Sequence, residues 1–154
     1  MDNLELVKAY LDYLVKIGTI IGGIFAINTY INNIKLRKAQ WLYSLYEKFY
    51  ESETYKNIRY IIDYERDDDI NALKNAIYFS NNDTLVEELV DYLNFFEFIA
   101  SLWVMKQLTV HEIAMLFEYY ILRIYDHEFI VEFLKEEGFK QLPKLVYRLK
   151  EEKS

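Results

Sequence analysis

Residues 17–34 read IGTIIGGIFAINTYINNI, eighteen consecutive residues without a charged side chain. As an α-helix rising about 1.5 Å per residue, this stretch spans about 27 Å, slightly less than the hydrocarbon core of a bilayer. Including Leu14, Val15 and Lys16 gives the full length, because the Lys16 ammonium can reach the headgroups. We therefore predict an N-terminal transmembrane helix. The alternative is a buried core helix of a soluble protein.

The charges on either side of this stretch predict its orientation. The residues before it are acidic overall, whereas Lys35, Arg37 and Lys38 follow directly after it. Lysine and arginine favour the cytoplasmic side of a membrane, so we expect a single-pass protein of the cell membrane with its N-terminus outside. The acidic start and the lack of a small-x-small cleavage site indicate a retained anchor. We predict an anchor over 1–34 and a cytoplasmic helical domain over 35–154.

Small residues recur every fourth position along the predicted anchor, at Gly18, Gly22 and Ala26. In lipid, this spacing lets two helix backbones approach closely, and packing drives their association. Thr19 and Gly23 widen the same smooth face. We therefore predict a homo-oligomer that assembles through this face.

The remaining chain predicts an all-α bundle of about five helices. Apolar residues recur at steps of three and four throughout it, and no run alternates as a strand would. Thr109 and Glu112 fit a capping box, Asp83 is a candidate N-cap, and Gly138 is a natural helix terminator. The expected helices cover residues 35–64, 70–79, 84–107, 110–137 and 142–150.

Composition argues against several classes of function. The chain has no cysteine, which excludes thiolate metal sites and cysteine nucleophiles. Its formal charge of −7 repels a phosphate backbone, so the 15 tyrosines and 10 phenylalanines indicate a helical core rather than a nucleic-acid surface. His111 and His127 lack the companion residues of a di-iron or zinc helix motif. No serine lies in a glycine-framed elbow. We predict a protein without a catalytic motif, metal or cofactor.

Two charged residues stand at boundaries between polar and apolar helix faces. Glu97 lies within the run Leu93 to Ala100, and Arg123 occupies a similar boundary on a later helix. The simpler interpretation is an ion pair between Glu97 and a cation such as Arg123 inside the domain. The alternative interpretation is that Glu97 and Arg123 belong to a polar seam that binds a partner.

The order of features resembles a family of small prokaryotic membrane-anchored proteins described only as a domain of unknown function. The resemblance rests on the apolar anchor, the segment Ala39 to Tyr43, the run Leu93 to Ala100, and Phe117 to Tyr120 with Arg123. It implies one membrane helix joined to a short helical cytoplasmic domain, and it implies no activity or cofactor.

These observations favour a membrane-anchored, non-enzymatic interaction or scaffold protein that self-assembles or recruits a protein partner. The alternative is a ligand-gated membrane effector of an antiviral system, in which tyrosines and Arg59, Arg66 or Arg123 line a nucleotide site. A third possibility is a wholly soluble helical protein whose first helix belongs to the core.

Overall fold

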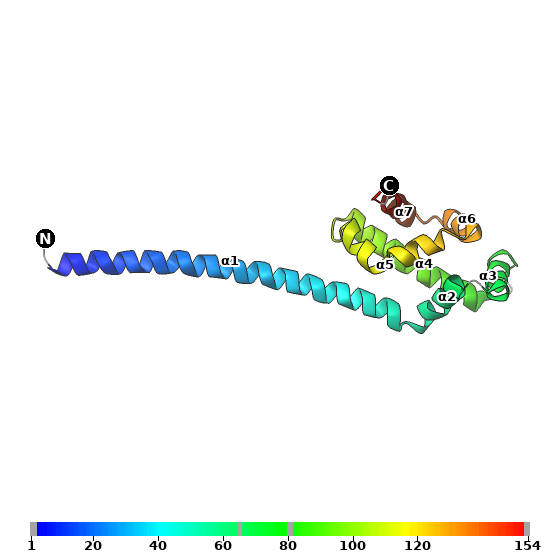
Figure 1. The fold of residues 1–154 in the computed structure, drawn as a ribbon, viewed down its shortest axis with the longest axis horizontal. Helices are drawn as coiled ribbons and strands as arrows, with labels where there is room; N and C mark the ends of the chain where they lie inside the picture. The colour runs from blue at the N-terminus through cyan, green and yellow to red at the C-terminus, as the bar shows by residue number, and fades with distance from the viewer. Residues whose placement is uncertain (1–2, 65, 80–81, 153–154) are drawn as a thin grey trace. The chain divides into compact units, whose positions relative to one another are not determined.

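The computed structural model describes residues 3–64, 66–79 and 82–152, and it confirms the predicted all-α class. Seven helices and no strand occur in these ranges (Figure 1). The helices are α1 (Asn3–Glu51), α2 (Glu53–Tyr64), α3 (Asp67–Phe79), α4 (Asp83–Val104), α5 (Val110–Ile124), α6 (Glu128–Glu136) and α7 (Gln141–Glu152).

The chain divides into two compact units, residues 1–45 and 46–154, whereas the predicted domain boundary lies after Ile34. The first unit is α1 as far as Leu45. This helix is long and apolar enough to cross a membrane, and none of its apolar stretch is buried within the protein. Every side chain from Tyr10 to Arg37 is exposed. The prediction of one long apolar N-terminal helix is therefore confirmed.

Helix α4 is the centre of the second unit, where it contacts α2, α3, α5 and α7. The sequence predicts one apolar face on this helix, but burial extends further around it because neighbours pack on several sides. Leu93 and Ala100, for example, are fully buried. The buried residues of α4 are Leu85, Leu89, Tyr92, Leu93, Phe95, Phe96, Ile99, Ala100 and Leu102.

The prediction of an unbroken helix over 35–64 is wrong, because α1 ends at Glu51 and α2 begins at Glu53. Ser52 lies between them, and its hydroxyl accepts a hydrogen bond from the Tyr55 N–H at 3.4 Å. A serine hydroxyl that accepts from a first-turn N–H marks a helix start. Neither proline nor glycine accompanies this break, so the apolar period alone does not reveal it.

The remaining helix ends agree with the sequence in part. The capping box of Thr109 and Glu112 at the start of α5 is confirmed. Gly138 follows α6 with φ of 78°, as expected of a terminator. The N-cap of α4 is Asn82 rather than Asp83, because the Asn82 side chain accepts from the Leu85 N–H at 3.2 Å. Residues 80 and 81, which precede this cap, lie outside the described ranges.

The predicted helix over 110–137 is two helices, α5 and α6. Helix α5 ends at Ile124, and His127 occupies the N-cap position of α6 with extended backbone angles. Short-range bonds close the end of α5, including Asp126 N–H to the Arg123 carbonyl at 3.2 Å. The division accounts for one helix more than the five predicted after the anchor.

Candidate functional site

The three small residues Gly18, Gly22 and Ala26 form what we call the small-residue face of α1. A methyl group added at Gly18 or Gly22 would meet no atom within 4 Å, so space next to the backbone is open. Ala26 is exposed as well. A second helix can therefore approach this face closely, as small-xxx-small packing requires.

Polar groups in and beside the apolar stretch have partners within the helix. The Thr19 hydroxyl donates to the Val15 carbonyl at 2.9 Å. The Lys16 ammonium pairs with the Asp12 carboxylate one turn earlier, at 2.6 Å. A hydroxyl bonded back to its own helix needs no water, and a paired lysine brings less net charge toward the apolar stretch. Both contacts reduce the cost of placing this segment in lipid.

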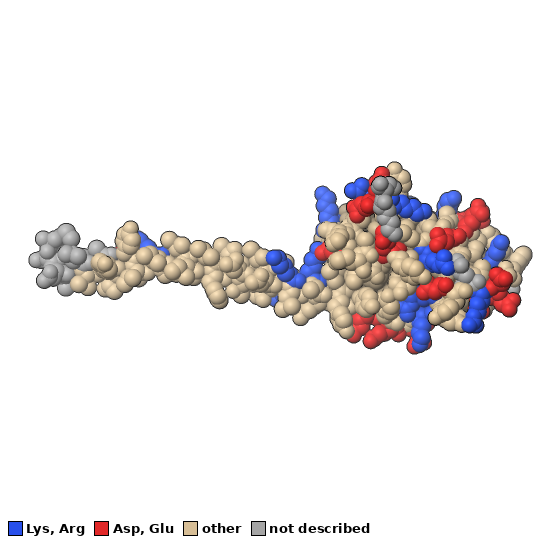
Figure 2. Space-filling view, in the orientation of Figure 1, with Lys and Arg blue, Asp and Glu red and all other residues tan. Residues whose placement is uncertain are grey.

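Lys35 and Arg37 follow the apolar stretch on exposed positions of α1, and Lys38 is half-buried. In the space-filling view, the middle of α1 carries no Lys, Arg, Asp or Glu, and blue side chains mark both of its ends (Figure 2). By length and composition, this helix could cross a membrane, and a basic segment follows its apolar stretch.

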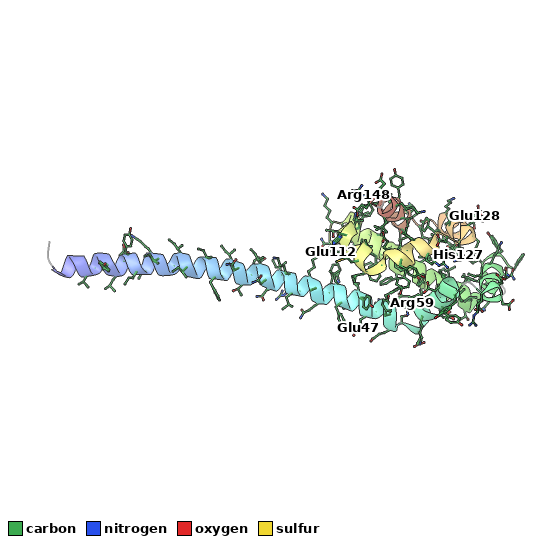
Figure 3. All side chains as sticks on the ribbon, viewed as in Figure 1. Glu47, Arg59, Glu112, His127, Glu128 and Arg148 are labelled. Atoms are coloured by element: carbon green, nitrogen blue, oxygen red, sulfur yellow. The ribbon has the colours of Figure 1, made fainter. Side chains whose placement is uncertain are left out.

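Arg59 of α2 holds the end of α1 (Figure 3). Its guanidinium donates to the carbonyl of Phe49 at 2.9 Å and to the carbonyl of Tyr50 at 3.0 Å. The same group lies over the rings of both residues, 4.8 Å and 4.7 Å from their centroids. The last carbonyls of a helix lack partners within it and carry partial negative charge, so a cation there is favourable. One side chain thus joins α1 to α2.

Phe49 inserts the last turn of α1 into an aromatic cluster of the second unit. The Phe49 side chain is fully buried. Next to it, the hydroxyls of Tyr50 and Tyr120 share a hydrogen bond of 2.6 Å, which joins α1 to α5. Aromatic pairs at such separations stabilise beyond their buried area. Rings within 6.1 Å of the Phe49 centroid belong to Tyr50, Tyr55, Tyr92, Phe95, Phe96, Phe117 and Tyr120.

Three tyrosines of the second unit, Tyr50, Tyr92 and Tyr125, favour their neutral forms. Burial and the hydrogen bond to Tyr120 raise the pKa of Tyr50 above its ordinary value. Burial raises the pKa of Tyr92 well above 10, and the nearby Asp63 carboxylate adds to the effect. Burial, together with the Glu97 carboxylate, raises the pKa of Tyr125 to about 12. These hydroxyls therefore act as neutral hydrogen-bonding groups and offer no base near neutral pH.

Glu97 of α4 accepts backbone hydrogen bonds at the start of α7. Its carboxylate receives the N–H groups of Lys140 at 3.0 Å, Gln141 at 2.9 Å and Leu142 at 2.7 Å. The first N–H groups of a helix lack intrahelical acceptors and favour a negative charge. The Glu97 side chain therefore fixes α7 onto α4, a role that differs from both the predicted ion pair and the predicted polar seam.

Arg123 lies elsewhere, on α5, where its guanidinium donates to Asp126 at 3.2 Å. An open hollow of about 410 Å³ is lined by Arg123 with Glu118, Tyr119, Leu122 and Asp126. A different hollow of about 330 Å³ is lined by Glu97 together with residues of α4 and the segment 137–139. The two residues predicted as one polar seam therefore line separate hollows.

The other candidate groups named from the sequence are two arginines, Arg59 and Arg66, and two histidines, His111 and His127. Arg66 lies over the Tyr60 ring, 5.3 Å from its centroid, and Arg59 is bound to the end of α1 as described above. His111 is exposed on α5, and His127 occupies the N-cap position of α6. Within the described ranges, no three His, Cys, Asp or Glu side chains gather as metal ligands.

Sequence reasoning did not single out Phe49, and it named Arg59 only as a candidate nucleotide-site residue. An arginine ten residues after a phenylalanine carries no recognised spacing, because their contact depends on the break at Ser52. The comparisons with known proteins add no family assignment, so the resemblance described above stays a prediction. No family model, no curated protein and no solved structure matches this chain.

Proposed function

We propose that this protein is a single-pass membrane protein whose helical domain acts as a non-enzymatic interaction module at the cytoplasmic face. The observation that carries the proposal is the exposure of every side chain from Tyr10 to Arg37. Apolar side chains left in water cost roughly 25 cal/mol per Å², and large exposed apolar surfaces mark contact with lipid or protein. A lipid bilayer covers such a surface on all sides of the helix.

The ends of the apolar stretch support the proposed orientation. Lys35 and Arg37 lie on the side of the predicted cytoplasmic domain, and the Lys16 charge is offset by Asp12 on the other side. The positive-inside preference then puts residues 46–154 in the cytoplasm.

Self-assembly through the small-residue face is the second part of the proposal. The open space beside Gly18 and Gly22 supports it. Arg59 and Phe49 fix the last turn of α1 within the second unit. Association of the anchors would bring the domains together and create a surface for a partner.

Fractionation of cell membranes with an alkaline carbonate wash tests the anchor. We expect the protein to stay in the pellet, and we expect Ile20→Arg with Ile24→Arg to release it, because arginine at the centre of a membrane helix costs about 2.5–3.5 kcal/mol. The matched control places two arginines at exposed apolar positions of the domain, Tyr64→Arg with Phe79→Arg. Release of the unmodified protein by carbonate would contradict the proposal.

The absence of cysteine makes the orientation directly measurable. Asn3→Cys and His111→Cys each introduce one thiol, before and after the apolar stretch. In intact cells, a membrane-impermeant maleimide should label the first variant only. Labelling of the second variant alone would reverse the proposed orientation.

A further inference from the structure

Helix α7 has one buried face and one exposed face of opposite character. Its buried residues are all aliphatic, namely Leu142, Leu145, Val146 and Leu149. The exposed side carries Lys144, Tyr147 and Arg148, followed by Glu151 and Glu152 in the last turn, and the exposed Lys140 precedes the helix. Lys144, Tyr147 and Arg148 stand at the i, i+3 and i+4 positions of α7 and therefore share one helix face. We call them the α7 basic face. Figure 3 shows Arg148 at the outside of this helix.

The α7 basic face is a positive region in an acidic domain. Residues 46–154 contain 13 lysines and arginines against 22 aspartates and glutamates, a net charge of −9. Residues 138–152 contain four lysines and arginines against two glutamates, Glu151 and Glu152, a net charge of +2. An anionic surface is therefore attracted at α7 and repelled by most of the rest of the domain.

The contacts of these cations leave them available for stronger anionic partners. Lys144 donates to the Gln141 side chain at 3.2 Å. Arg148 pairs with Glu151 at 3.1 Å and with Glu152 at 3.8 Å, all within α7. The Arg148 side chain is 50% exposed in these pairs. Such exposed pairs are weak and readily exchange for phosphate oxygens.

The proposed anchor supplies the anionic surface. It tethers the domain beside the cytoplasmic leaflet, so the domain meets headgroups at a high effective concentration. Anionic lipids attract basic segments near the leaflet. Tyr147 lies among the cations and is 67% exposed, and tyrosine favours the headgroup region because it has an apolar ring and a polar hydroxyl.

We propose that the α7 basic face docks the cytoplasmic domain onto anionic phospholipid headgroups of the membrane that holds the anchor. This inference rests on the proposed membrane location. Docking selects one orientation of the domain, because the acidic remainder turns away from the leaflet. It also makes the position of the domain depend on the fraction of anionic lipid.

A polarity-sensitive fluorophore at position 147 tests the docking in the full chain. Tyr147→Cys is labelled and placed in nanodiscs of phosphatidylcholine alone or with phosphatidylglycerol. The control label uses Tyr64→Cys, because Tyr64 on α2 has a matched exposure of 66%. We expect a blue shift at position 147 only with phosphatidylglycerol, and we expect high salt to reverse it.

Neutralising two cations should weaken the docking without removing the anchor. Lys144→Gln with Arg148→Gln should lower the docking equilibrium about 30-fold, whereas Lys56→Gln with Lys74→Gln should leave it unchanged. No shift with phosphatidylglycerol, an equal shift in phosphatidylcholine, or an equal shift at position 64 would overturn the inference.

Further outcomes of the same measurement distinguish lipid docking from nucleic-acid binding and from failure of the membrane anchor. A shift on adding single-stranded RNA, with none on adding phosphatidylglycerol, would replace lipid by nucleic acid as the partner. Retention of the protein in the nanodisc without any shift at position 147 would overturn the docking alone. Failure of the chain to enter the nanodisc would instead overturn the proposed function, and with it this inference.

Discussion

Arg59 shows how one side chain can define the end of a helix. Its planar guanidinium reaches two carbonyls at once and stacks on the rings of the same two residues, Phe49 and Tyr50. A lysine at this position would keep the charge but would lose the fork geometry and the flat stacking surface. The contact therefore depends on the shape of the group as much as on its charge.

Arg59→Lys should lower the free energy of unfolding of residues 46–154 by about 2 kcal/mol, because it removes one charge-assisted hydrogen bond and most of the stacking. Urea unfolding in detergent micelles, followed by near-ultraviolet circular dichroism, measures the change. The matched control is Arg66→Lys, since Arg66 is exposed and lies over the Tyr60 ring. Equal effects of the two substitutions would count against the role of Arg59.

Tyr125 should make the domain sensitive to high pH. Its pKa is raised to about 12, so between pH 10 and pH 12 the unfolded chain loses the hydroxyl proton while the folded chain keeps it. The free energy of unfolding is therefore unaffected by Tyr125 below pH 10, and it falls as the pH rises from 10 to 12. Tyr125→Phe should remove about 2 kcal/mol of this loss. Urea midpoints at pH 9 and pH 12 test it, and identical losses in both proteins would refute the assignment.

At the scale of the element, α4 and α6 end in the same way with different residues. After α6, Gly138 N–H bonds to the Lys135 carbonyl at 3.3 Å and Phe139 N–H to the Leu134 carbonyl at 3.0 Å. After α4, the residue in the corresponding left-handed position is Lys106, with φ of 59°. Glycine adopts this conformation without steric cost, whereas lysine does not.

Lys106→Gly should therefore raise the free energy of unfolding by about 1 kcal/mol, and Gly138→Ala should lower it by a similar amount. Space does not limit the second change, because a methyl group at Gly138 meets no atom within 4 Å. Thermal unfolding of both variants measures whether each substitution raises or lowers the stability. Gly18→Ala is the control, since it lies in the other unit. A destabilised Lys106→Gly variant would contradict the argument.

At the scale of the whole molecule, the two units have different reasons for their structure. Residues 46–154 fold around α4 with a buried aromatic and aliphatic core. The exposed stretch of α1 gains no stability from that core, and under the proposed function lipid and other copies of the chain surround it. We therefore expect substitutions in the anchor, and not in the second unit, to change the association between copies of the chain.

Gly18→Ile with Gly22→Ile should reduce association in membranes about tenfold or more, because bulky side chains keep the two backbones apart. Energy transfer between labelled copies in vesicles, followed as the protein-to-lipid ratio falls, measures the association. Ile20→Phe with Ile24→Phe adds bulk roughly opposite the small-residue face and serves as the control. Unchanged transfer in the glycine variant would show that another face mediates assembly.

Local sequence features determined much of this protein. The apolar length of residues 17–34, the three- and four-residue period of the remaining chain, and the Thr109 capping box each depend on neighbours within a few turns. For that reason, the helical class, the long N-terminal helix and the start of α5 were predictable. Gly138 was predictable too, since its left-handed conformation is a local property of the backbone.

The tertiary structure alone decided the partners of Glu97 and Arg59 and the break at Ser52. Glu97 binds N–H groups more than forty residues away, and Arg59 binds carbonyls that become free only where α1 ends. A charge at a helix boundary has several possible partners in the sequence. Which partner it takes depends on which helix end the packing brings within hydrogen-bond distance, and no periodicity along the chain encodes that distance.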